Sequence, residues 1–171
     1  MLTILDGAPA LAEGEYVAFV DPPGRRTFHD LAALRRRPGT GVVFRAYHLV
    51  PHRTVAENVV LALHYHGVAR AERARCAVAA LAEVGLARRA DALPFSLSVG
   101  ERRLVTIARA LVNEPRLLLC EEPTADLDPP AAAAVLEVLD RLHASGLTLL
   151  VVTGDERAAG HAQRVVRGAR R

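Results

Sequence analysis

Short, uninterrupted apolar runs recur along the chain, and each is typical of a β-strand that is covered on both faces. They lie at 16–20, 41–44, 117–120 and 147–152. Between these runs, apolar residues recur at helical spacing instead. Strands that alternate with helices predict an α/β fold with a mostly parallel sheet flanked by helices. A weak helix at 155–163 and an edge strand at 164–167 are expected to complete it.

Local signals place the helices more closely. Helical spacing predicts helices at 28–34, 55–65 and 71–84. Ser98 and Glu101 form a Ser-x-x-Glu capping box, which predicts that a further helix begins there. Asp128 followed by Pro129 marks the start of another helix. No strand pattern interrupts 52–113, so we expect this piece to be helical and the remainder to contain the sheet.

The length of 171 residues and the hydrophobic content of 51% suit one globular domain with a sizeable core. The apolar runs are far too short to span a bilayer, and the residues after Met1 lack the pattern of a signal peptide. These features indicate a protein of the cytosol. Cys76 and Cys120 lack the spacing of metal ligands, so we expect them to be reduced thiols in the core.

The chain has no lysine, and all 22 of its Lys and Arg residues are arginine. These arginines are scattered in short groups, which indicates solvated faces and is compatible with a position beside a membrane. Aromatic residues make up only 4% of the chain, so there is no stacking platform for single-stranded nucleic acid, and no nucleic-acid partner is expected. Four histidines could form a metal site, although isolated histidines are more often surface residues than ligands. They are His48, His52, His64 and His66.

Two stretches in the second half of the chain carry the most specific pattern. The first is Leu-Ser-Val-Gly-Glu at 97–101, and the second runs over 116–128 through an apolar strand into Glu-Glu-Pro-Thr-Ala-Asp-Leu-Asp. Together they resemble the signature motif, Walker B strand and D-loop of ATP-binding cassette (ABC) transporter subunits. Segments 48–59, 108–116 and 150–153 resemble most closely the lipoprotein-release, macrolide-export and cell-division group of these ATPases.

The resemblance implies one ABC ATPase-like domain over 1–171, with a helical subdomain at about 52–113 and a RecA-like core in the remainder. The fold would be a truncated P-loop NTPase-like cassette, because the small antiparallel sheet region that the family has after Leu34 is missing from the sequence. The resemblance further implies ATP and Mg²⁺ as ligands. The implied partners are a membrane permease and an ABC ATPase in a homo- or heterodimer, at the inner face of the cell membrane.

The resemblance also assigns roles to single residues. Glu122 stands at the position of the general base that polarises the attacking water, and Glu121 stands at the Walker B magnesium position. A helix N-terminus with a serine and a closely approaching glycine backbone can bind a terminal phosphate, in this family on the partner's nucleotide. The matched nucleotide-binding positions are Gly24, Ser98, Gly100, Glu101 and Asp128.

The chain departs from the family at most positions that would hold its own nucleotide. The phosphate loop should read G-x-x-x-x-G-K-[ST], but the segment 21–28 has Thr27 in place of the lysine and Phe28 in place of the magnesium-binding hydroxyl. Arg45 replaces the Q-loop glutamine, and it would repel magnesium but could pair with a phosphate or a carboxylate. Gly154 replaces the H-loop histidine.

Three functions are open on this pattern. The first is a degenerate pseudo-ATPase subunit that offers its signature face, in which Val99 replaces a glycine, to a partner ATPase and a permease. The second is an active ATP-hydrolysing subunit with an atypical phosphate loop, and the third is a decayed cassette without function. The joint loss of four contacts to nucleotide or magnesium favours the first, since each is worth about 2.7–4 kcal/mol by analogy with oxyanion-hole donors.

Overall fold

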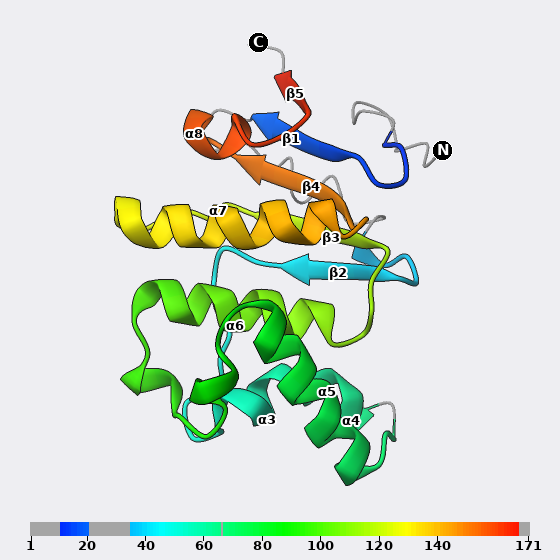
Figure 1. Ribbon diagram of the computed structural model, residues 1–171, viewed down its shortest axis with the longest axis vertical. Coiled ribbons are helices and arrows are strands. Elements are labelled where there is room, and N and C mark those ends of the chain that lie inside the picture. The colour runs from blue at the N-terminus through cyan, green and yellow to red at the C-terminus, as the bar shows by residue number, and fades with distance from the viewer. Residues whose placement is uncertain (1–10, 21–34, 66, 168–171) are drawn as a thin grey trace.

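The computed structural model describes residues 11–20, 35–65 and 67–167, and in this part five strands form one sheet (Figure 1). The strand order is β2-β3-β4-β1-β5, and every neighbouring pair is parallel. The expected mostly parallel sheet is thus confirmed. The strands are β1 (Tyr16–Val20), β2 (Thr40–Val43), β3 (Leu117–Glu121), β4 (Thr148–Thr153) and β5 (Arg164–Arg167).

Successive side chains of the central strands enter two different apolar clusters, because residues of a strand point alternately to opposite faces. In β3, Leu118 belongs to the larger cluster, which includes the helices, whereas Leu117 and Leu119 belong to the smaller one. Both faces of β3 are therefore buried, as its uninterrupted apolar run predicted. The edge strand β5 is only half-buried, in keeping with its polar ends Arg164 and Arg167.

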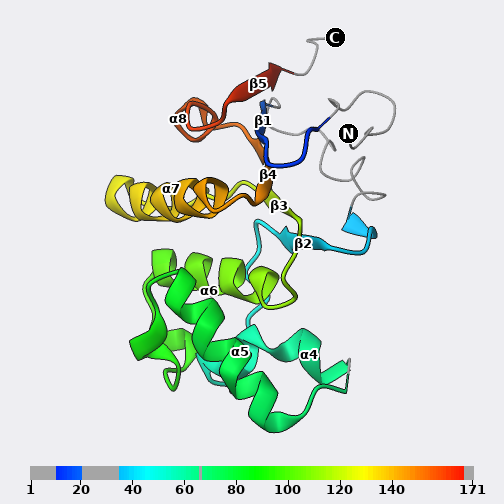
Figure 2. The same ribbon diagram turned by 45° about the vertical axis from the view of Figure 1, so that its right-hand side comes forward.

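Three helices lie on one side of the sheet, namely α6 (Val99–Leu111), α7 (Pro129–Ala144) and α8 (Glu156–Ala159) (Figure 2). Helix α7 packs against both α6 and β4, and α6 packs against β2. Helix α8 is shorter than the predicted helix at 155–163. Asp155 is its N-cap, and it ends at Gly160, which disfavours helical backbone.

A helical region adjoins α6 at the end of the molecule that lies away from β5 (Figure 1). The prediction of one helix over 55–65 is wrong: the chain forms two, separated at Val60, where φ is −88° and ψ is 10°. The β-branched pair Val59 and Val60 disfavours continuous helix here. The elements are α3 (Val55–Val59), α4 (Leu61–Tyr65), α5 (Arg70–Glu83) and the 3-10 turns η1 (Ala87–Arg89) and η2 (Pro94–Ser96).

Helix α3 packs against α5 and α6, which joins the helical region to the core. The subdomain boundaries at 52 and 113 stay a prediction. Both cysteines are free thiols; Cys76 is half-buried on α5, and full burial in β3 raises the pKa of Cys120 to about 12. None of the helices in the described part has the length and apolar character needed to cross a membrane. The predicted helix at 28–34 lies outside the described residues.

Candidate functional site

The N-terminus of α6 is closed by its own side chains. Ser98 Oγ accepts a hydrogen bond from the Glu101 N–H at 3.1 Å, and Glu101 Oε2 accepts one from the Ser98 N–H at 2.8 Å. This is the predicted capping box. Ser98 and Val99 are both exposed, and Val99 retains 44% of its accessible surface. The helix end is therefore rigidly built and open to a partner.

Arg89 holds the capping glutamate from outside the helix. Its Nε donates to Glu101 Oε1 at 3.0 Å, and its Nη2 donates to Glu101 Oε2 at 3.2 Å. The hydrogen bond from Arg89 is the main reason why the pKa of Glu101 lies below its ordinary value, with the bond to Ser98 adding to it. Glu101 thus completes the cap as a carboxylate, and this partner was not evident from the sequence.

Gly100, at the start of α6, packs closely against α7. A Cβ atom at residue 100 would lie 3.0 Å from the Cβ of Ala131, in the first turn of α7. This is tighter than most Cβ contacts, so a side chain at residue 100 would require Ala131 to shift by a few tenths of an ångström. The start of α7 is itself fixed by Asp128, the predicted cap, whose Oδ1 accepts from the Ala131 N–H at 2.8 Å.

The carboxylate at the predicted magnesium position is engaged by the loop after β2. Glu121 Oε2 accepts the Arg45 N–H at 3.1 Å, and Arg45 Nη2 lies 3.3 Å from Asp126 Oδ2. Mg²⁺ requires oxygen ligands in octahedral arrangement. Here the Arg45 guanidinium contacts Asp126, the Arg45 N–H is bonded to Glu121, and the sequence puts Phe28 where a hydroxyl ligand belongs. These residues do not fit a bound magnesium ion.

The carboxylate at the predicted base position joins the ends of two strands. Glu122 Oε2 accepts from Thr153 Oγ1 at 2.9 Å, Glu122 Oε1 accepts from the Gly154 N–H at 2.8 Å, and the Glu122 N–H donates to Val152 O at 2.8 Å. Glu122 has a φ of +44°, which is uncommon for a residue with a side chain. Each carboxylate oxygen thus accepts one hydrogen bond from the last residue of β4 or the residue after it, and this ties the ends of β3 and β4 together.

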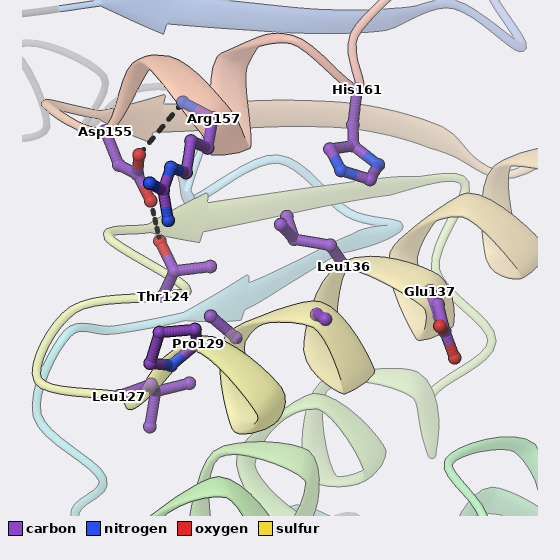
Figure 3. A pocket seen from close by; sticks show the side chains of 10 residues that line it. Thr124, Leu127, Pro129, Leu136, Glu137, Asp155, Arg157 and His161 are labelled. Atoms are coloured by element: carbon purple, nitrogen blue, oxygen red, sulfur yellow. Dashed lines mark hydrogen bonds between the residues drawn. The ribbon is translucent and has the colours of Figure 1, made fainter.

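The segment after β3 is joined to α8 next to a pocket of about 470 Å³ (Figure 3). Thr124 Oγ1 donates to Asp155 Oδ2 at 3.0 Å, and Asp155 Oδ1 accepts from the Arg157 N–H at 2.9 Å. Apolar side chains of α7 line one side of the pocket, while acidic and basic side chains both lie at its edge. The mixed lining favours no single class of ligand.

Two arginines of α6 that the sequence did not identify hold the loop after β2. Arg103 is fully buried, and its Nη1 and Nη2 donate to Phe44 O at 2.7 Å and Arg45 O at 2.8 Å. Arg109 donates to Tyr47 O at 2.7 Å and to His48 O at 2.8 Å. The one signal in the sequence is that Arg103 lies four residues before Ile107, on the apolar face of the helix.

A second, shallower groove of about 380 Å³ lies between this loop and η2. Phe95 at its edge is 73% exposed, which is unusual for so large an apolar side chain. Arg102 lines the groove and donates from Nε to Pro94 O at 3.0 Å. The exposed ring thus lies beside a hollow with a mixed apolar and basic lining. The remaining lining residues are Tyr47, His48, Leu49 and Pro51.

The structure brings some of the predicted site residues together and leaves others apart. Glu121 and Glu122 are consecutive at the end of β3, and Ser98, Gly100 and Glu101 share the start of α6. Gly24 lies outside the described residues, as does His66 of the four histidines. Within the described ranges, no group of three or more His, Cys, Asp or Glu side chains is arranged to hold a metal ion.

Comparison with known proteins gives the family. The family model described as ABC transporter matches residues 13–125. The macrolide export ATP-binding/permease protein MacB of Burkholderia pseudomallei is 44% identical over 137 residues, which is 80% of this chain and 21% of that protein. MacB of Agrobacterium fabrum is 42% identical over the same length. The chain thus spans only about a fifth of these curated relatives, at 21% of their length.

Among solved structures, the dimeric ATP-binding cassette MJ0796 bound to ADP and Pi has a TM-score of 0.77 and 28% sequence identity. The match covers 92% of this chain and 82% of that cassette. It confirms the expected ABC cassette fold of the P-loop NTPase type, including the placement of helices on the flank of a parallel sheet. By sequence and by fold, this chain belongs to the ATP-binding domains of ABC transporters.

Proposed function

We propose that this chain is a degenerate cassette subunit of a membrane transporter, which supports a nucleotide bound to a partner ATPase and hydrolyses little or no ATP itself. The observation that carries the proposal is the contrast between its two faces. The signature helix is capped by Ser98, braced by Arg89 through Glu101, and open to a partner. At the chain's own nucleotide site, by contrast, Glu121 and Glu122 form hydrogen bonds with other residues of the chain.

Several contacts support the loss of the chain's own chemistry. A general base must point toward its attacking water, whereas each oxygen of Glu122 accepts one hydrogen bond from Thr153 or Gly154, which directs the carboxylate toward the end of β4. Arg45 occupies the neighbourhood of Glu121 and Asp126. The sequence gives a further reason, because Thr27 stands where the family has the lysine that contacts the phosphates. Each feature alone would slow hydrolysis, and together they leave the site without its main electrostatic contacts.

The partners follow from the relatives and from the surface of the chain. The named relatives are ATP-binding/permease proteins, and the solved cassette is dimeric. By analogy we propose a permease and a second cassette as partners, at the cytoplasmic face of a membrane. We assign the groove beside the exposed Phe95 to the permease, because it places a large exposed aromatic next to a hollow of about 380 Å³.

Two measurements test the proposal. Calorimetry should show no ATP binding by the isolated chain at micromolar concentrations, with or without Mg²⁺. In a reconstituted pair with a complete ABC ATPase, Ser98→Arg should depress the partner's turnover, since it removes the cap and fills the space beside the helix end. The matched control is Ser96→Arg, an exposed serine in η2 outside the capping box.

Either of two outcomes would contradict the proposal. A pair that forms with an unchanged rate in the Ser98→Arg variant would make the signature helix a relic, as in a decayed cassette. Micromolar ATP affinity together with a basal rate that Glu122→Gln abolishes would instead show an active ATPase with an atypical phosphate loop. The two measurements therefore separate the three functions that the sequence left open.

A further inference from the structure

Arg103 is a buried cation whose two terminal nitrogens donate to the backbone of another segment, while its buried Nε has no hydrogen-bond partner in the described part of the chain. It has no exposed surface, yet the described residues place no carboxylate in hydrogen-bond contact with it. Its two terminal nitrogens bond to the carbonyls of Phe44 and Arg45, and its guanidinium lies 4.6 Å from the centre of the Tyr47 ring. Burying a charge in this way is costly unless it is well compensated. These contacts therefore fix the path of the loop after β2.

The consequence of that path is the placement of Arg45. With its carbonyl held by Arg103, its N–H points to Glu121 at 3.1 Å and its guanidinium reaches Asp126 at 3.3 Å. One residue thus bonds to both acidic side chains, one from the end of β3 and one from the segment before α7. The third acidic side chain in this region, Glu122, is satisfied by Thr153 and Gly154.

We infer that Arg45 is a built-in cation that keeps divalent metal away from Glu121 and Asp126, and that Arg103 is the residue that positions it. The guanidinium supplies one positive charge and a donor to Asp126, and the Arg45 backbone N–H donates to Glu121. A divalent ion that approached would meet this charge and would have to displace both contacts. The inference deepens the proposed function, because it names what has replaced the metal in the chain's own site.

Manganese titration of the full chain tests the inference, with the free ion followed by electron paramagnetic resonance. Mn²⁺ serves as the probe because it takes the same oxygen ligands as Mg²⁺. Arg45→Gln should raise Mn²⁺ affinity by about tenfold, the factor that Coulomb's law gives for removing a unit charge about 6 Å from a divalent ion in water. The gain should disappear in the double variant Arg45→Gln/Glu121→Gln.

The matched control for net charge is Arg88→Gln, an exposed arginine in η1. It should leave the Mn²⁺ titration unchanged. If Arg45→Gln changes affinity no more than Arg88→Gln does, Arg45 is not what keeps metal away and the inference fails. A tight Mn²⁺ site in the unaltered chain that Glu121→Gln removes would overturn it equally.

The positioning role of Arg103 has its own control within the same helix. Arg109 also donates to two carbonyls of the loop, at Tyr47 and His48, but it does not contact Arg45. Arg103→Lys should therefore raise Mn²⁺ affinity towards that of Arg45→Gln, whereas Arg109→Lys should not. Equal behaviour of the two lysine variants would reduce Arg103 to a purely structural residue.

Circular dichroism shows whether each variant is folded, and the exposed Arg45→Gln variant decides the main inference even if a buried arginine tolerates no change. All of these titrations use the isolated chain without ATP. They can therefore fail while the partner assay of Ser98 succeeds, or the reverse, so the inference and the proposed function are tested separately.

Discussion

The guanidinium of Arg89 spans both oxygens of the Glu101 carboxylate, with distances of 3.0 Å from Nε and 3.2 Å from Nη2. Glu101 in turn accepts the N–H of Ser98, the first residue of the capping box. The ion pair thereby joins the 3-10 turn η1 to the start of α6. Glu101 lies 12 residues after Arg89 in the sequence. This arrangement braces the helix end that we propose faces a partner's nucleotide.

We expect Arg89→Ala to lower the free energy of unfolding by about 0.5 kcal/mol, the size of a partly exposed ion pair. Ser98→Ala should cost more, about 1 kcal/mol, because it leaves a helical N–H without its acceptor. Urea unfolding followed by circular dichroism measures both. Arg88→Ala is the neighbouring control, and a loss as large as that of Arg89→Ala would show that the pairing with Glu101 is irrelevant to stability.

The same pair predicts a pH dependence. The pKa of Glu101 is lower in the folded chain than its ordinary value of 4.5. Its contribution to stability is therefore fully present above that value and is lost as the pH falls through the lower, folded pKa. Glu101→Gln should be less stable than the parent chain at neutral pH, and the difference should shrink in acid. A difference that grows on acidification would contradict the assignment.

Gly100 and Ala131 should behave as a coupled pair. Gly100→Ala places a methyl group 3.0 Å from the Ala131 Cβ, and overpacking of this kind typically costs 1–3 kcal/mol. Ala131→Gly removes the clash, so the double variant should recover part of the loss. A double-mutant cycle in urea measures the coupling. Additive effects of the two substitutions would mean that the helices separate without strain at this point.

Glu122 should matter for stability and not for hydrolysis by the chain alone. Glu122→Gln is expected to leave any basal ATPase rate unchanged, because the site is already incomplete. Glu122→Ala should lower the free energy of unfolding by about 1–3 kcal/mol, since it leaves the buried Thr153 hydroxyl and the Gly154 N–H without their acceptor. Thr153→Val removes the donor to Glu122 and also the acceptor of the Asp155 N–H, so it should be destabilising as well. A stable Glu122→Ala variant would show that the strand ends do not need this link.

Restoring the phosphate loop is the converse test of the degenerate site. The triple variant Arg26→Gly, Thr27→Lys and Phe28→Ser returns the glycine, the lysine and the hydroxyl of the family pattern. These residues lie outside the described part of the chain, so the prediction rests on sequence alone. Calorimetry should show measurably tighter ATP binding than in the parent chain. Unchanged binding would indicate that the frame around the loop has been lost as well.

Local sequence determined much of the fold. The apolar run at 117–120 is a strand buried on both faces, and the caps Ser98 and Asp128 begin α6 and α7 as predicted. These features depend on residues within a few positions of one another, where hydrogen-bond geometry and side-chain period act directly. The prediction failed at 55–65, where the apolar residues have helical spacing throughout. The spacing gave no sign of the break at Val60 that divides the segment into α3 and α4.

The motif positions were also readable in sequence, but their present bonding was not. Nothing near Glu122 indicates that its oxygens bond to Thr153 and Gly154, which are 31 and 32 residues away. That contact exists because β3 and β4 are neighbours in register, so their ends coincide. Likewise Arg45 could have paired with a phosphate or a carboxylate, and the observed partner is the Asp126 carboxylate, 81 residues further along the chain.

The burial of Arg103 depends most clearly on the tertiary structure. By composition an arginine on a helix is expected at the surface. Packing of α6 beside β2 carries this side chain to the carbonyls of Phe44 and Arg45, which lie 59 and 58 residues earlier in the sequence. Sequence alone identified the family and the positions that have changed. The three-dimensional arrangement decided which contacts replaced the lost ones, since those contacts join segments that only the folded sheet and helices bring together.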